Sequence, residues 1–193
     1  MNFFSEAPTQ GLGYRNMCRF FSGPIFHTKA LGSMEYYMRL DTDSFLLAPL
    51  PRDPFLAMNE TGGAYGFLAR AVEHPSLSAG LYEAVRGVAG RLDKTGQAPS
   101  SEELLVHRGL LGSQLGRWDG SFFYNNLEVL HLPFWRSPAQ LEIFDALDRL
   151  GGFLRSRWGD GPVRTLSLAF TGTKRELVRF DDVPYWHQNL VLL

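Results

Sequence analysis

The spacing of apolar residues predicts two long helices in this chain. In residues 78–92, leucine and valine recur every three or four positions, which is the period of one buried helix face. A second helix is predicted from Ser137-Pro138, because serine suits the N-cap and proline the first helical position. Its apolar face runs to Gly151-Gly152, a pair that favours a helix end. Ser100 and Glu103 have capping-box spacing and predict one further helix start.

Short apolar segments that are rich in aromatic or branched residues predict strands. They lie at 34–40, 64–69, 165–170 and 176–180. Residues 171–174 are predicted to form the turn between the last two strands. Because predicted strands and helices alternate, the sequence favours an α/β fold in which helices cover a sheet. No shift in composition divides the chain, so residues 1–193 are predicted to form one domain.

The composition narrows the class of protein further. Of the 193 residues, 45% are hydrophobic, so the chain can bury a sizeable core. The 19 basic and 20 acidic residues give a net charge of −1, which excludes nucleic-acid binding by bulk positive charge. No apolar run approaches the roughly 20 residues that a membrane span requires. The single cysteine, Cys18, excludes an internal disulfide and a multi-cysteine zinc site.

Asp41-Thr42-Asp43 directly follows the first predicted strand and is the first candidate site. Two carboxylates with this spacing can bind a divalent cation, and the cation can hold a diphosphate. A solvated turn is the plainer explanation for one such motif. His187 follows the acidic pair Asp181-Asp182 and could add an imidazole ligand, although a surface turn would also explain it. Because ligands gather at strand ends, we expect Asp41 and His187 to lie within about 5 Å of each other.

Two further segments bring polar and aromatic side chains together. Asn125-Asn126 with Glu128 would suit a site that binds hydroxyl groups and needs a nucleophile or base, or the asparagines form an ordinary turn. Trp158 could stack on a sugar, while Asp160 would be presented by a tight glycine–proline turn. A turn with a core tryptophan explains the same residues equally well. The residues alone leave these alternatives open.

Several motifs occur in a fixed order along nearly the whole chain. They are Tyr14-Arg15-Asn16-Met17-Cys18-Arg19-Phe20, Tyr36-Tyr37-Met38-Arg39-Leu40-Asp41-Thr42-Asp43, Asp53-Pro54-Phe55, Tyr65-Gly66-Phe67, Asn126-Leu127-Glu128, Phe134-Trp135-Arg136-Ser137, Asp148-Arg149-Leu150-Gly151-Gly152-Phe153, Arg157-Trp158-Gly159-Asp160-Gly161-Pro162-Val163, and Phe180-Asp181-Asp182 followed by His187. In this order they resemble the fungal Golgi α-1,2-mannosyltransferases, glycosyltransferase family 15. Because the motifs are co-linear, the resemblance is far more specific than any one of them.

The resemblance implies a GT-A-type α/β fold with a mixed sheet flanked by helices. It also implies transfer of mannose from GDP-mannose to a mannose-bearing glycan or glycoprotein, with retained configuration and Mn²⁺ as cofactor. Asp41 and His187 match the family's metal ligands, and Asp43 with Arg39 is expected to bind the nucleotide. The family usually has Glu-Pro-Asp where this chain has Asp41-Thr42-Asp43, and often a second histidine where it has Trp186.

The resemblance also implies a set of catalytic residues. Glu128 matches the proposed nucleophile or transition-state carboxylate, Tyr14 matches an active-site tyrosine, and Asp160 is expected beside them. Glu128 is expected in a loop that leads into the aromatic pair Phe134-Trp135. The family's cysteine and histidine shortly before this glutamate are replaced here by Ser121-Phe122.

The chain is markedly shorter than the catalytic domains of this family. The resemblance therefore implies that the N-terminal βα portion, with much of the nucleotide site, and the membrane anchor are missing. An exposed sheet edge or apolar patch is then expected where that portion would pack. Family members act in the Golgi, and the sequon Asn59-Glu60-Thr61 is compatible with a secretory lumen. The main alternative to an enzyme is a non-catalytic carbohydrate-binding or assembly subunit, and a hydrolase that uses the same carboxylates is a third.

Overall fold

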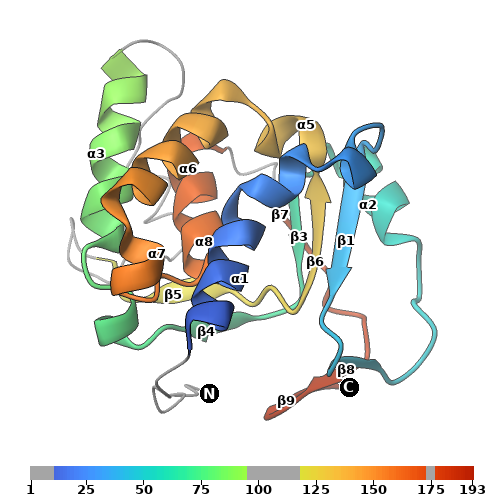
Figure 1. Cartoon of the computed structure of the whole chain (residues 1–193). Coiled ribbons are helices and arrows are strands. Elements are labelled where there is room, and N and C mark those ends of the chain that lie inside the picture. Colours follow the sequence, from blue (N-terminus) through green and yellow to red (C-terminus); the bar gives the residue numbers. More distant parts are fainter. Residues whose placement is uncertain (1–10, 95–117, 173–176) are drawn as a thin grey trace.

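The computed structural model of the chain describes residues 11–94, 118–172 and 177–193, and Figure 1 shows the arrangement of its elements. The α-helices are α1 (Leu12–Ser22), α2 (Pro54–Thr61), α3 (Leu81–Lys94), α5 (Leu132–Trp135), α6 (Pro138–Leu150), α7 (Gly152–Arg155) and α8 (Asp160–Thr171). The strands are β1 (Tyr36–Leu40), β2 (Phe45–Leu46), β3 (Tyr65–Phe67), β4 (Arg70–Val72), β5 (Ser121–Phe123), β6 (Leu127–His131), β7 (Leu177–Arg179), β8 (Tyr185–His187) and β9 (Leu190–Leu192). Short 3₁₀ helices lie at Pro24–His27, Lys29–Leu31 and Pro75–Leu77.

Within the described residues, four strands form a mixed sheet in the order β1-β6-β3-β7. Strand β6 runs antiparallel to both β1 and β3, whereas β3 and β7 are parallel. The register sets Arg39 of β1 opposite Glu128 of β6. The strands predicted at 34–40, 64–69 and 176–180 are confirmed as β1, β3 and β7. Strand β1, which leads to Asp41, stands at one end of this order.

The two faces of the sheet bury different apolar clusters, because side chains alternate along each strand. On one face, Leu127 and Val129 of β6 pack in a cluster with Met58 of α2. On the other face, Leu130 packs with buried residues of α3, α6 and α8. Figure 1 shows these three helices together on one side of the sheet and α2 on the other. Glu128 has the same parity as Leu130 and therefore points toward the helices.

The proline and glycine that predicted the ends of one helix lie at the ends of α6, although the Ser137 side chain makes no capping hydrogen bond. Helix α6 follows Ser137, with Pro138 in its first turn, and ends at Gly151, whose φ of 67° favours glycine. The helices predicted at 78–92 and 137–151 are therefore confirmed as α3 and α6.

The strand predicted at 165–170 is wrong, because these residues belong to helix α8. Every residue from 160 to 170 is buried, so this helix has no polar face to reveal its period. Such an apolar run cannot be told from a buried strand by periodicity alone. The missed signal lies at the start, where Asp160 and Pro162 occupy the first turn.

Two smaller sheets complete the described part of the fold. Strands β4 and β5 pair antiparallel, and β2, β8 and β9 form a three-stranded sheet near the C-terminus (Figure 1). The predicted α/β class, with a mixed sheet flanked by helices, is confirmed. The helix start predicted at Ser100 and Glu103 and the end of the turn predicted at 171–174 lie outside the described residues. Among the helices described, none is long and apolar enough to cross a lipid bilayer.

Candidate metal centre and buried carboxylate layer

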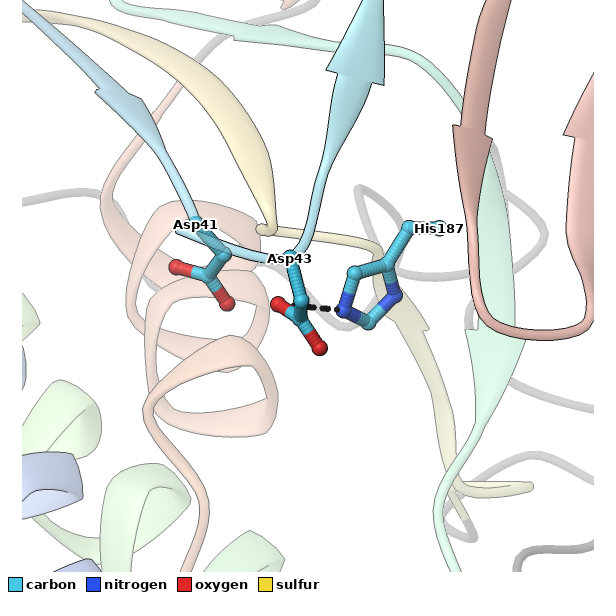
Figure 2. A group of neighbouring side chains, drawn as sticks. All are labelled: Asp41, Asp43 and His187. Carbon is cyan, nitrogen blue, oxygen red and sulfur yellow. Dashed lines mark ion pairs between the residues drawn. The ribbon is translucent and has the colours of Figure 1, made fainter.

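Asp41, Asp43 and His187 come together at the ends of two sheets, although His187 is distant from the others in sequence (Figure 2). One ligand atom from each side chain lies within 4.8 Å of the other two. His187 Nε2 is 3.0 Å from Asp43 Oδ1. The expected proximity of Asp41 and His187 is therefore confirmed, and Asp43 joins them.

Strand pairing explains this convergence. The backbone N–H of Asp41 donates to the carbonyl of Asn126 at 2.8 Å, which ties the end of β1 to the start of β6. A turn closed by the Ser44 N–H, which donates to the Asp41 carbonyl at 3.0 Å, then leads into β2. Strand β2 pairs antiparallel with β8, the strand that carries His187. The pairing of β2 with β8 thus places the His187 imidazole beside Asp41 and Asp43.

Neighbouring side chains hold two of the three ligand groups, Asp41 and His187. The amide nitrogen of Asn126 donates to Asp41 Oδ2 at 2.6 Å and lies 3.3 Å from His187 Nε2. The other ring nitrogen of His187, Nδ1, hydrogen-bonds the hydroxyl of Tyr124. Side-chain exposure is 4% for His187, 24% for Asp41 and 58% for Asp43, so the cluster opens to solvent on the Asp43 side.

The donor set of this cluster fits a divalent metal ion. Two carboxylates and one imidazole are ligand types that Mn²⁺ accepts. Ligand atoms around one ion at about 2–2.5 Å must lie within about 5 Å of one another, as they do here. A hydrogen bond from Gln188, together with the neighbouring His187, lowers the pKa of Asp43 and favours its ionised form. Asp41, Asp43 and His187 could therefore hold such an ion with little rearrangement.

A layer of buried charged groups continues from this cluster toward α8. Arg39 donates from Nε to Asp41 Oδ1 at 2.7 Å and from Nη1 to Asp160 Oδ2 at 2.6 Å. Asn125 donates to the same Asp160 oxygen at 2.7 Å. Phe21 of α1 covers the guanidinium of Arg39, which lies 4.1 Å from its ring centroid. The resemblance predicts nucleotide binding for Arg39, yet its guanidinium is buried and already joins two carboxylates.

Glu128 lies within β6, so the prediction that it sits in a loop is wrong. Its neighbours Leu127, Val129 and Leu130 are apolar, and residues 127–130 are all buried, which is typical of a strand covered on both faces. The carboxylate is fully buried, and its Oε2 accepts from the Tyr65 hydroxyl at 2.9 Å and lies 3.0 Å from Arg164 Nε. Burial raises the pKa of Glu128 to about 7, although Arg164 and Arg39 oppose the rise. Among the described residues, Oε1 has no hydrogen-bond partner.

Tyr14 lies on α1 and contacts Arg157. Its hydroxyl accepts a hydrogen bond from Arg157 Nη2 at 3.2 Å, and burial raises the pKa of Tyr14, so the hydroxyl keeps its proton. Trp158 is 4% exposed and donates to the Ala79 carbonyl at 2.9 Å. The core-tryptophan alternative is therefore correct, and the sugar-platform alternative is wrong. Asp160 begins helix α8 and is buried, so it is presented by the first turn of a helix and not by a tight glycine–proline turn.

Sequence reasoning missed the partners of these side chains. Arg164 is 1% exposed within a segment that reads as apolar, and a lone charge in such a run is a signal of pairing in the core. Tyr124 carries no comparable signal, because its contact with His187 spans 63 residues of sequence. Only the fold brings these two residues together.

Comparison of the sequence with known proteins identifies relatives that match nearly the whole chain. The sequence model of the family described as glycolipid 2-alpha-mannosyltransferase matches residues 7–192. The chain is 33% identical to the probable mannosyltransferase KTR2 of Saccharomyces cerevisiae over 185 residues. This alignment covers 90% of this chain and 43% of that protein. It is 32% identical over 178 residues to the O-glycoside alpha-1,2-mannosyltransferase homolog 3 of Schizosaccharomyces pombe, covering 91% of this chain and 46% of that protein.

Two solved structures share the fold. The Mn/GDP form of core-mannan synthase A from Aspergillus fumigatus matches with a TM-score of 0.83 at 26% identity, over 93% of this chain and 49% of that one. Ktr4p of Saccharomyces cerevisiae in complex with GDP matches with a TM-score of 0.83 at 26% identity, over 93% of this chain and 46% of that one. This chain thus spans about half the length of the relatives that it matches. Because the family's sequence model covers nearly the whole chain, the protein belongs to glycosyltransferase family 15, the glycolipid 2-alpha-mannosyltransferases.

Proposed function

We propose that this chain carries the metal-binding and catalytic residues of an α-1,2-mannosyltransferase that takes mannose from GDP-mannose. The observation that carries the proposal is the convergence of Asp41, Asp43 and His187 within 4.8 Å. Relatives whose structures contain GDP, one of them in a Mn/GDP form, support a nucleoside diphosphate as the leaving group. We further propose a mannose-bearing glycan or glycoprotein as the acceptor and the Golgi as the compartment, both from family membership.

In this proposal, Asp41, Asp43 and His187 hold Mn²⁺. The bound ion would act as a Lewis acid that offsets the charge of the diphosphate. Arg39 is buried between Asp41 and Asp160, so its role is to orient these carboxylates and not to contact the nucleotide directly. Asp43 is the most exposed of the three proposed ligands, so it is the one most open to solvent.

Glu128 is proposed as the carboxylate that responds to positive charge at the anomeric carbon, as the second carboxylate does in retaining sugar chemistry. Its Oε1 supports this role, because a buried carboxylate oxygen without a partner among the described residues is costly unless a ligand uses it. Tyr65 and Arg164 fix the other oxygen and thereby set the direction of the group. Asp160 and Tyr14 flank this layer and are proposed to shape the sugar site.

One observation favours a second candidate, a non-catalytic carbohydrate-binding or assembly subunit. Glu128 is fully buried and paired with Arg164, so its carboxylate cannot contact a sugar unless the side chains that cover it move. Such a subunit would bind a nucleotide or a glycan without transferring mannose.

The test incubates the purified chain with GDP-mannose, Mn²⁺ and a mannobiose acceptor, and follows trisaccharide formation by mass spectrometry. Asp41→Ala and Glu128→Gln should each abolish transfer, whereas Glu142→Gln, at an exposed position of α6, should not. Calorimetry should show Mn²⁺-dependent GDP binding in Glu128→Gln and its loss in Asp41→Ala. Metal-dependent binding without transfer by the wild type would favour the non-catalytic subunit. The absence of both transfer and metal-dependent binding would overturn the proposal.

A further inference from the structure

We propose that Tyr124 and Asn126 are positioning residues of the metal centre, which hold His187 and Asp41 in the orientation that binds an ion. This inference rests on the proposed function, because it assumes that Asp41, Asp43 and His187 are metal ligands. It concerns a different question, namely what fixes the ligand atoms before an ion arrives.

The two nitrogens of the His187 ring face different groups. Nδ1 hydrogen-bonds the Tyr124 hydroxyl, and the two rings meet edge to face with centroids 5.8 Å apart. Nε2 faces the cluster, 3.0 Å from Asp43 Oδ1 and 3.3 Å from the amide nitrogen of Asn126. Because the His187 side chain is only 4% exposed, rotating the ring would break these contacts inside the protein. The position of each nitrogen is therefore fixed by its neighbours.

This arrangement decides which nitrogen can bind a metal. A neutral imidazole carries one hydrogen, and only the nitrogen without it offers a lone pair. When His187 donates its Nδ1 hydrogen to the Tyr124 oxygen, the lone pair lies on Nε2, which is the nitrogen beside Asp43. A hydrogen bond to the far ring nitrogen is the usual way in which proteins orient a metal-binding histidine. Tyr124 supplies that bond here.

Asn126 performs the corresponding task for Asp41. Its amide nitrogen donates to Asp41 Oδ2 at 2.6 Å, while Arg39 donates to Oδ1 at 2.7 Å. The carboxylate plane is thus held from both sides, and each oxygen keeps lone-pair capacity for an ion.

A short link between β5 and β6 carries both positioning residues. The backbone N–H of Tyr124 donates to the Ala69 carbonyl at 2.9 Å, and the Asn126 carbonyl accepts from the Asp41 N–H at 2.8 Å. The link is therefore anchored to the sheet on both sides of Asn125. Anchored backbone gives the two side chains a defined direction, which a mobile loop would not.

The test measures Mn²⁺ binding alone, from the electron paramagnetic resonance signal of free Mn²⁺, without nucleotide or acceptor. Tyr124→Phe removes only the hydroxyl and should weaken Mn²⁺ binding by about 10- to 100-fold. Tyr36→Phe is the matched control, because its hydroxyl lies 3.5 Å from Asn59 Oδ1 and away from the cluster. If Tyr124→Phe fails to fold, Asn126→Ala tests the other arm, with a loss of the same order expected.

A second readout separates positioning from packing. Nitrogen-15 chemical shifts of His187 without metal should show hydrogen on Nδ1 in the wild type and a shift toward Nε2 in Tyr124→Phe. Unchanged Mn²⁺ affinity and unchanged nitrogen-15 shifts in a folded Tyr124→Phe would overturn this inference. Loss of Mn²⁺ binding in Asp41→Ala would, in that case, still support Asp41 as a metal ligand. If the wild type and Asp41→Ala bind Mn²⁺ equally weakly, the metal centre itself is wrong, and this inference falls with it.

Discussion

Replacing Glu128 by glutamine should change how the stability of the protein depends on pH. The carboxyl group is fully buried, and burial raises its pKa from 4.5 to about 7. Folding therefore favours the protonated form of Glu128 between these two values. The stability that this form contributes is fully present below pH 4.5 and is lost as the pH rises through 7.

The size of the effect follows from the two pKa values. Each pH unit between them is worth about 1.4 kcal/mol, so this group should remove about 3 kcal/mol of unfolding free energy between about pH 4 and 8. Glutamine resembles the protonated acid in shape but does not titrate. The ion pair of Glu128 with Arg164 forms only when the carboxyl group is ionised, so its effect is already contained in the folded-state pKa of about 7. Other costs of Glu128→Gln do not vary with pH, because neither glutamine nor the guanidinium titrates in this range.

Urea unfolding followed by tryptophan fluorescence gives the unfolding free energy of both proteins at each pH. The difference, wild type minus Glu128→Gln, should fall by about 3 kcal/mol from the acidic to the alkaline end. Glu142→Gln on α6 is the control for the loss of one carboxylate at an exposed position. A wild-type-minus-variant difference that stays constant to within about 0.5 kcal/mol would show that folding does not alter the titration of Glu128.

Three further outcomes are expected. Gly152→Ala should lower the unfolding free energy by about 1–3 kcal/mol, because an added Cβ would lie 2.2 Å from Trp158 Cε3; unchanged stability in urea would contradict this packing. Asp148→Asn should lower the unfolding free energy by at most about 1 kcal/mol, and by less in high salt. The reason is that the ion-paired side chains are partly exposed, Asp148 by 30% and Arg19 by 40%. A larger loss that does not depend on salt would contradict a weak, screened ion pair. Asp41→Ala should abolish Mn²⁺-dependent GDP binding in calorimetry, and retained binding would exclude Asp41 as a ligand.

The sequence predicts those elements of the fold that show a pattern on one face. Helices α3 and α6 each have one buried face that recurs every three or four residues, and α6 also carries a proline near its start and a glycine at its end. The strand predicted at 165–170 is wrong because helix α8 is buried on all sides, so its period leaves no trace in the sequence. Its correct placement depends on tertiary contacts with α1, α3 and β5.

Some features of the candidate site can likewise be predicted from the sequence, and others arise only from the fold. The pairing of Asp41 with His187 follows from a general rule that polar groups gather where strands end, and both residues follow or end a strand. The contact between Tyr124 and His187 and the burial of Glu128 beside Arg164 follow from strand register and helix packing. Neither feature is encoded in local spacing, so sequence reasoning could name Glu128 but could not predict its surroundings.

The most direct test of the central claim is the position of Mn²⁺ in crystals of this protein soaked with the ion. Anomalous scattering locates manganese without any assumption about activity. One peak is expected at about 2–2.5 Å from ligand atoms of Asp41, Asp43 and His187, with His187 contributing Nε2. A peak elsewhere on the protein, with His187 Nε2 still 3.0 Å from Asp43 Oδ1, would contradict the proposed metal centre.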